Sequence, residues 1–148
     1  MTSVEKVKIN LDSALAQTQL TTLQNVIQRM ASNSANCKTW CVTLVSAILV
    51  LAVDKSNSQI IWIPIFPIIA FAALDVYYLA MEKAFRNTYN NFVKKLHSGE
   101  LIASDFDVTF AKEKTCYLQR QAINSFSIWA FYLMLMALVA ITNIITSG

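Results

Sequence analysis

The sequence predicts an all-α membrane protein with an N-terminal amphipathic helix, about three transmembrane helices and a long cytoplasmic helical stalk. Of its 148 residues 55% are hydrophobic and only 14% charged, whereas a soluble domain usually has roughly a quarter charged. The chain contains two glycines and two prolines, so few residues interrupt a helix. Uncharged runs occupy residues 39–53, 56–74 and 121–148, and a helix needs about 20 apolar residues to cross a bilayer.

The first predicted helix lies before the first uncharged run. Its apolar residues recur at spacings of three, four or their sums, as on one face of a helix: Leu11, Leu15, Leu23, Val26, Ile27 and Met30. Asp12 or Asn10 is the expected N-cap. We expect this helix to form a cytoplasmic domain of residues 1–36, joined through the polar link ASNSAN to a transmembrane and stalk domain of residues 37–146.

The three spans are predicted at about residues 37–53, 60–81 and 122–145. The first is short, so it requires Lys38 to reach the interface, a locally thinner bilayer, or residues 31–37 in the same helix. Pro64 and Pro67 stand three apart in the outer half of the second span. They indicate either a hinge or a helix start, because proline is well tolerated in a first turn, and the helix start is favoured more for Pro64 than for Pro67.

A helical hairpin of residues 82–121 is predicted between the second and third spans. One helical face carries Leu79, Glu82, Arg86, Tyr89 and Val93, and Glu82 precedes Arg86 at the favourable i, i+4 spacing. The second span therefore continues into the stalk, where Gly99 suits a helix end. Asp105 or Asp107 can cap a return helix over residues 110–121 that continues into the third span.

The distribution of Lys and Arg predicts the orientation. Four precede the first span, seven lie between the second and third, and only Lys55 lies in the first connection. Positively charged loops stay in the cytoplasm. This pattern predicts that the N-terminus and the stalk lie in the cytoplasm.

Polar residues within the spans are the positions that could line a water path if the chain conducts ions. Because three spans are too few to enclose water, conduction would then require a symmetric homo-oligomer, a tetramer or larger. The candidate pore-lining or gating residues are Thr39, Thr43, Ser46, Asp75, Asn124 and Thr142. The alternative for the small residues is close packing and hydrogen bonding between helices.

Asp75 needs its own explanation, because a carboxylate inside hydrocarbon normally faces a partner or a water path. One prediction is a buried salt bridge or hydrogen bond to Lys38, Arg29 or Arg120. Another is a charged ring at the inner mouth of a pore. The third is an exposed acid at the membrane interface.

Enzyme motifs are missing from the sequence. The single histidine allows no His-based metal cluster, and two glycines cannot build a phosphate-binding loop. Cys37 and Cys41, at i, i+4, and Cys116 are expected to be free thiols, lipidation sites or packing residues rather than metal ligands. We therefore expect no enzyme activity, no metal and no cofactor.

Basic and aromatic residues of the stalk are candidates for binding a nucleotide or a short single strand, through phosphate contacts and stacking. They are Arg86, Tyr89, Lys94, Lys95, Lys112, Lys114 and Arg120. The alternative is that this basic cluster sets the topology and anchors the chain on anionic lipid.

The segment ALDVYYLAMEKAFRNTYNNFV, residues 73–93, resembles a motif of the SLATT-type small membrane effectors of bacterial anti-phage defence. The matching residues are Leu74, Asp75, Tyr77, Tyr78, Leu79, Glu82, Phe85, Arg86, Tyr89 and Asn90. The chain has Ala80 and Met81 where the family pattern has a basic residue before the glutamate. The order of helices over residues 10–145 is also similar to that family.

The resemblance implies a pore-forming effector in a bacterial inner membrane that depolarises this membrane and arrests growth. Members of that family work beside a nucleotidyltransferase, as in CBASS-like and Hailong-type systems, and this implies gating by a nucleotide or oligonucleotide signal. The alternative function is a non-conducting membrane anchor whose stalk recruits a soluble partner.

Overall fold

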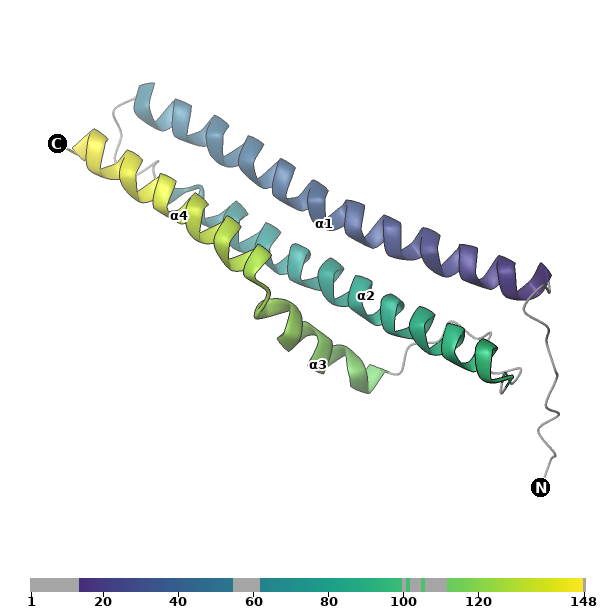
Figure 1. The fold of residues 1–148 in the computed structure, drawn as a ribbon. Coiled ribbons are helices and arrows are strands. Elements are labelled where there is room, and N and C mark those ends of the chain that lie inside the picture. The colour runs from purple at the N-terminus through teal and green to yellow at the C-terminus, as the bar shows by residue number, and fades with distance from the viewer. Residues whose placement is uncertain (1–13, 55–61, 100, 102–104, 106–111, 148) are drawn as a thin grey trace.

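The structure, a computed structural model, describes residues 14–54, 62–99, 101, 105 and 112–147, the side chains of 54, 112–117 and 147 excepted. Four helices follow one another along the chain, and no strand occurs among these residues. The prediction of an all-helical chain is confirmed. Helices α1 and α2 run antiparallel, while α3 and α4 lie along different halves of α2 (Figure 1).

Helix α1 runs without interruption from Ala14 to Asp54, 41 residues or about 61 Å at 1.5 Å per residue. The polar residues ASNSAN are therefore part of this helix and not a separate link, and the alternative that residues 31–37 belong to the helix of the first span is confirmed. They stay helical because Ser34 is 8% exposed and packs against α2. The expected domain boundary after residue 36 falls inside α1, while Asp12 and Asn10, the predicted caps, lie outside the described residues.

Helix α2 spans Ile65–Ser98 and is also continuous. Pro64 occupies its N-cap position and Pro67 lies in its first turn, where an N–H has no intrahelical acceptor. The helix-start prediction is therefore confirmed for both prolines. Gly99 ends α2 in the left-handed conformation, with φ 69°. Its N–H faces the carbonyls of Lys95 and Leu96, as predicted for a helix stop.

Helices α3, Lys112–Ile123, and α4, Phe126–Ser147, are separated at Asn124 and Ser125. The predicted continuity of the return helix with the third span is therefore wrong. The Ser125 carbonyl accepts the first hydrogen bonds of α4, from the N–H groups of Ile128 and Trp129. Asn and Ser compete with the helical ladder and favour helix starts. The third span is α4 alone, 22 residues or about 33 Å long.

Packing divides the hairpin into two halves. In the apolar half (residues 39–54, 65–81 and 126–147), α1, α2 and α4 share a core that includes Val45, Ile68 and Val139. In the polar half (residues 14–38, 82–98 and 112–123), α3 packs through Leu118 and Ala122 onto Ala84 of α2 and onto Ala80, just across the border. The N-terminal end of α1 packs onto the far end of α2 through a separate cluster: Ala16, Leu20, Phe92, Leu96 and Leu101.

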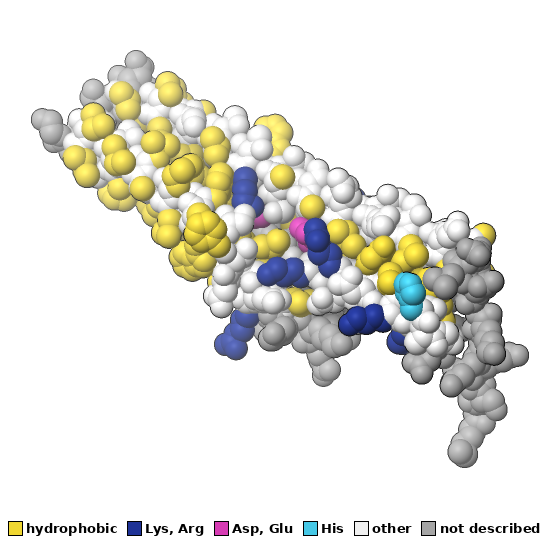
Figure 2. Space-filling model, viewed as in Figure 1, with side chains coloured by type: hydrophobic (Ala, Val, Ile, Leu, Met, Phe, Trp, Pro, Cys, Tyr) yellow, Lys and Arg dark blue, Asp and Glu magenta, His cyan; other side chains and the backbone are white. Residues whose placement is uncertain are grey.

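Hydrophobic side chains gather over the apolar half, and Lys and Arg side chains begin where it ends (Figure 2). Helices α1, α2 and α4 are each long and apolar enough to cross a membrane. Only 28%, 22% and 22% of their most hydrophobic windows are buried inside the chain. The remaining apolar surface faces outward, as contact with lipid requires.

Candidate functional site

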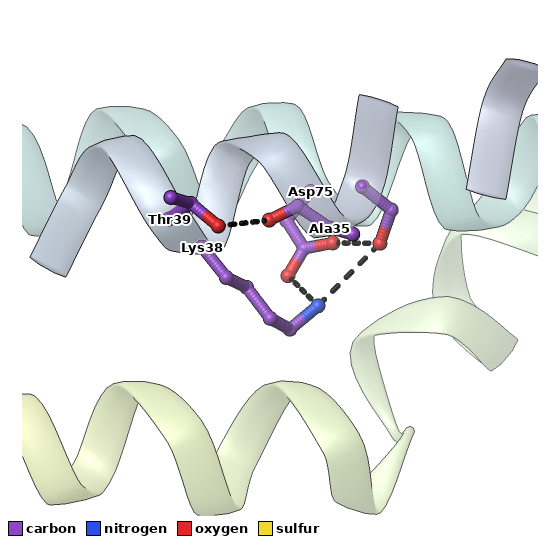
Figure 3. A network of polar contacts seen from close by, with 5 residues as sticks. Ala35, Lys38, Thr39 and Asp75 are labelled. Atoms are coloured by element: carbon purple, nitrogen blue, oxygen red, sulfur yellow. Dashed lines mark hydrogen bonds and ion pairs between the residues drawn. The ribbon is translucent and has the colours of Figure 1, made fainter. Parts of the chain in front are cut away.

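The most polar buried site is centred on Asp75 of α2, whose exposed fraction is 0% (Figure 3). Ser34 Oγ donates a hydrogen bond of 2.5 Å to Asp75 Oδ1. Lys38 Nζ lies 2.6 Å from Asp75 Oδ2 and 3.4 Å from Ser34 Oγ. The prediction of a buried salt bridge to a neighbouring helix is confirmed, and of the three basic residues predicted it is Lys38 that pairs.

The face of α1 that contacts α2 places these groups together. Ser34, Cys37, Cys41 and Val45 recur at spacings of three and four and are all buried. Ser34 is therefore the polar end of an otherwise apolar stripe. Lys38 is one turn after Ser34 and lies at the edge of the stripe, so its ammonium reaches the same carboxylate.

Exposure differs between the two ion partners. The Lys38 side chain is 22% exposed, whereas the Asp75 side chain is 0% exposed. A fully buried carboxylate is costly unless it is paired and hydrogen-bonded. The lysine has a path to the surface along its own flexible stem. The carboxylate is thus the fixed member of the pair and the ammonium the mobile one.

Tyr132 of α4 lies beside this pair and is 7% exposed. It packs in the core cluster that contains Cys41 of α1, and its hydroxyl lies near the carboxylate of Asp75. Tyr132 is six residues beyond the start of α4 at Phe126, which is about 9 Å along the helix. Asp75 and Tyr132 therefore lie inside the apolar half, about two turns from its border, while Ser34 and Lys38 are the last buried or partly buried polar residues of the polar half on α1.

The predicted pore-lining residues separate into two groups. Thr39, Thr43 and Ser46 are exposed on α1, facing away from the core of the chain. The hydroxyls of Thr39 and Thr43 donate hydrogen bonds to the backbone carbonyls one turn earlier, those of Ala35 and Thr39, at 3.3 and 2.9 Å. Ser46 and Thr142 line one groove of about 510 Å³ between α1 and α4.

The other two predicted residues lie elsewhere. Asn124 lies between α3 and α4, outside the third span. Asp75 is enclosed by its own chain.

The residues predicted to bind a nucleotide are spread over the polar half. Arg86 Nε donates to Glu82 Oε1 at 2.8 Å, and Lys95 Nζ lies 2.5 Å from Asp105 Oδ1, so Asp105 is engaged at the end of α2. Nine residues separate Arg86 from Lys95, which at 100° per residue puts them on opposite sides of α2.

The remaining residues of that set, where the structure describes them, do not come together in one pocket. Tyr89 accepts a hydrogen bond of 3.2 Å from Gln24 Nε2 of α1. Lys94 and Arg120 are exposed, on α2 and α3 respectively. The side chains of Lys112 and Lys114 lie outside the described residues, as does Asp107. The nucleotide-binding set stays a prediction.

Sequence reasoning missed Ser34 and Tyr132 as members of the buried network. One sequence signal could have indicated Ser34: it precedes Lys38 by one helical turn and shares its face. Tyr132 carried none, since one aromatic residue in an apolar run is ordinary. Only the packing of α4 against α1 and α2 reveals its place.

Metal chemistry has no support in the described side chains, where no three His, Cys, Asp or Glu residues form a group that could hold an ion. Cys37 and Cys41 are free thiols and both are buried. Comparison of the chain with protein-family models, with curated proteins and with solved structures finds no match.

Proposed function

We propose that this chain is the subunit of a homo-oligomeric pore in a bacterial inner membrane, with its N-terminus in the cytoplasm. The observation that carries the proposal is the outward-facing hydroxyl stripe, defined as Thr39, Thr43 and Ser46. Lipid tails offer these hydroxyls no hydrogen-bond partner, whereas the water of a lumen or a polar group of a second copy does.

A pore of this kind needs several copies. The centre of the apolar half is filled by side chains such as Val45, Leu135 and Val139, each at most 2% exposed, so water would have to pass between chains. The groove shared by Ser46 and Thr142 brings α4 to the edge of the same surface. A closed ring of four or more copies would place this edge on the inside.

The defence role and the signal rest on the resemblance of residues 73–93 to SLATT-type effectors. In this proposal the polar half is the cytoplasmic stalk, and its basic residues receive a nucleotide or oligonucleotide made by a partner nucleotidyltransferase. Helices α1 and α2 are unbroken between the polar and apolar halves. A displacement in the stalk would therefore move both spans.

Membrane potential in bacteria tests conduction. The chain is expressed alone from a tight promoter, and then with its neighbouring genes, while a voltage-sensitive dye reports the potential. Depolarisation in either condition supports a pore. Its absence in both overturns the pore and favours the alternative, a membrane anchor that recruits a soluble partner.

Thiol labelling then tests the hydroxyl stripe. Thr43→Cys and Ser46→Cys are compared with Ile69→Cys, which is 63% exposed on α2 and lies off the stripe. A cationic, membrane-impermeant thiol reagent should change conduction through the first two only, because it reacts with the thiolate in water. The parent chain, whose Cys37 and Cys41 are buried, gives the baseline. Equal reactivity at all three positions would remove the stripe from the lumen.

A further inference from the structure

The part of α1 that can face lipid is short. Its uncharged stretch, residues 39–53, is about 22 Å long at 1.5 Å per residue. The polar residues before this stretch belong to the same helix, but Ser32 and Asn36 are exposed there and present polar groups to the outside. The lipid-facing part of α1 therefore begins after Asn36, and residues 37–53, about 25 Å, are its upper limit.

Lys38 does not extend this length. Its ammonium turns back by one helical turn, to 3.4 Å from Ser34 Oγ, and lies 2.6 Å from Asp75 Oδ2. The charge is thus held beside the edge set by Asn36 and does not reach a more distant interface. Tilting of α1 away from the membrane normal can only shorten the length that spans the bilayer.

On α2 the same edge falls at Asp75, because this residue pairs with Lys38 across the interface. Apolar residues continue on α2 for nearly two more turns, as far as Met81. Helix α3 covers one side of that stretch, where Val76 and Leu79 pack against the cluster that α2 and α3 share. This continuation is therefore used for packing against α3 and adds little to the lipid-facing length.

Exposed aromatic residues mark the same edges. Trp40 and Trp129 stand at the inner ends of the apolar parts of α1 and α4, and Trp62 precedes α2 at the opposite end; each is more than half exposed. Tryptophan is enriched at membrane–water interfaces. From Trp129 to Ile145, the last exposed large apolar residue of α4, the length is about 25 Å. Two helices thus give the same thickness independently.

We propose that the lipid-facing surface of this chain fits a bilayer with a hydrocarbon core of about 25 Å, about 5 Å thinner than the average core of about 30 Å. The lipid that matches it has short acyl chains. In a thicker bilayer either the pair of Lys38 and Asp75 is drawn into hydrocarbon or the lipid thins around the chain, at a cost that rises with each ångström of mismatch.

Competition between lipids for the three tryptophans tests the match. The full chain is reconstituted in phosphatidylcholine with brominated acyl chains, which quench tryptophan on contact. Dimyristoleoyl, dioleoyl or dierucoyl phosphatidylcholine is added as competitor, and the recovered fluorescence gives its relative binding constant. We expect the shortest lipid, the dimyristoleoyl form, to bind about 3-fold or more tightly than the longest, the dierucoyl form. Equal binding, or tighter binding of the longest lipid, overturns the match.

Ser32→Leu with Asn36→Leu moves the proposed edge, because it makes the exposed polar band of α1 apolar. This double variant should lose the preference for the shortest lipid. Thr18→Leu with Thr22→Leu is the matched control, with the same spacing and exposure on α1, about 21 Å further into the polar half. The control should keep the preference of the parent. The same response of the two double variants overturns the assigned edge.

Depth-dependent quenching tests the edge without any leucine substitution. Chains that retain only Trp40 or only Trp129, with the other two tryptophans changed to phenylalanine, are placed in bilayers brominated either near the headgroup or near the chain end. Stronger quenching by bromine near the headgroup at both positions supports the edge, and stronger quenching by bromine near the chain end at either position overturns it. None of these readouts requires conduction, so their result is independent of the proposed pore.

Discussion

Replacing Lys38 with methionine should destabilise the chain more than replacing Asp75 with asparagine. At 2.6 Å the attraction between the two charges is about 6 kcal/mol for an effective dielectric constant near 20. Part of this attraction offsets the cost of burying both charges, so the consequence of each substitution depends on what the remaining partner can do.

The two remaining partners differ in their access to water. Without Lys38, the fully buried carboxylate keeps only hydroxyl donors, and we expect a loss of about 3 kcal/mol, at the lower end for a broken buried pair. Without the charge of Asp75, the partly exposed ammonium can extend to the interface, and we expect a loss of about 1–2 kcal/mol. The difference is about tenfold in the unfolding equilibrium constant.

The assay is SDS-induced unfolding in micelles, followed by far-UV circular dichroism. Glu82→Gln is the matched control: the same acid-to-amide change, two turns further along α2, in an i, i+4 pair whose Arg86 is 61% exposed. That pair should contribute only about 0.3–0.5 kcal/mol. If Asp75→Asn costs as much as Lys38→Met, or if neither exceeds the control, the assignment of a fixed carboxylate and a mobile ammonium is refuted.

Three further substitutions test other elements. Gly99→Ala should cost about 1 kcal/mol of unfolding free energy through its backbone conformation alone, because an added Cβ meets nothing within 4 Å; no loss would contradict the left-handed helix end. Pro67→Ala should leave conduction unchanged, since a proline in the first turn is no hinge, and altered gating would restore the hinge prediction. Lys94→Glu with Lys95→Glu should abolish a nucleotide response in the depolarisation assay while insertion, measured by membrane fractionation, is intact; an unchanged response would remove this pair from the ligand site.

The elements that were predictable from the sequence are those set by local chemistry. Uncharged runs determine which helices can meet lipid, and the end of α2 follows from the conformational freedom of Gly99. The start of α2 follows from the fixed φ of Pro64 and Pro67. Each of these signals acts within one or two turns, so no tertiary contact was needed to interpret it.

The elements that were not predictable depend on contacts between helices. The composition of the polar stretch around Ser34 is typical of a link. The stretch is nevertheless helical, and Ser34 donates a hydrogen bond to Asp75 across the α1–α2 interface. The break at Ser125 interrupts a run with no Gly or Pro, and the pair Asn124-Ser125 is only a weak local signal for ending one helix and starting another. The role of Tyr132 is invisible until α4 is placed beside Asp75.

The break between α3 and α4 also determines how the three apolar helices are connected to the polar half. Because α1 and α2 continue from the polar half into the apolar half, their spans move with any displacement of the polar half. Helix α4 is joined to α3 only through Asn124 and Ser125, where the helical ladder is interrupted. The position of α4 is therefore set by its packing against the other two helices, in the core that includes Val45, Ile68 and Val139, rather than by continuity with the polar half.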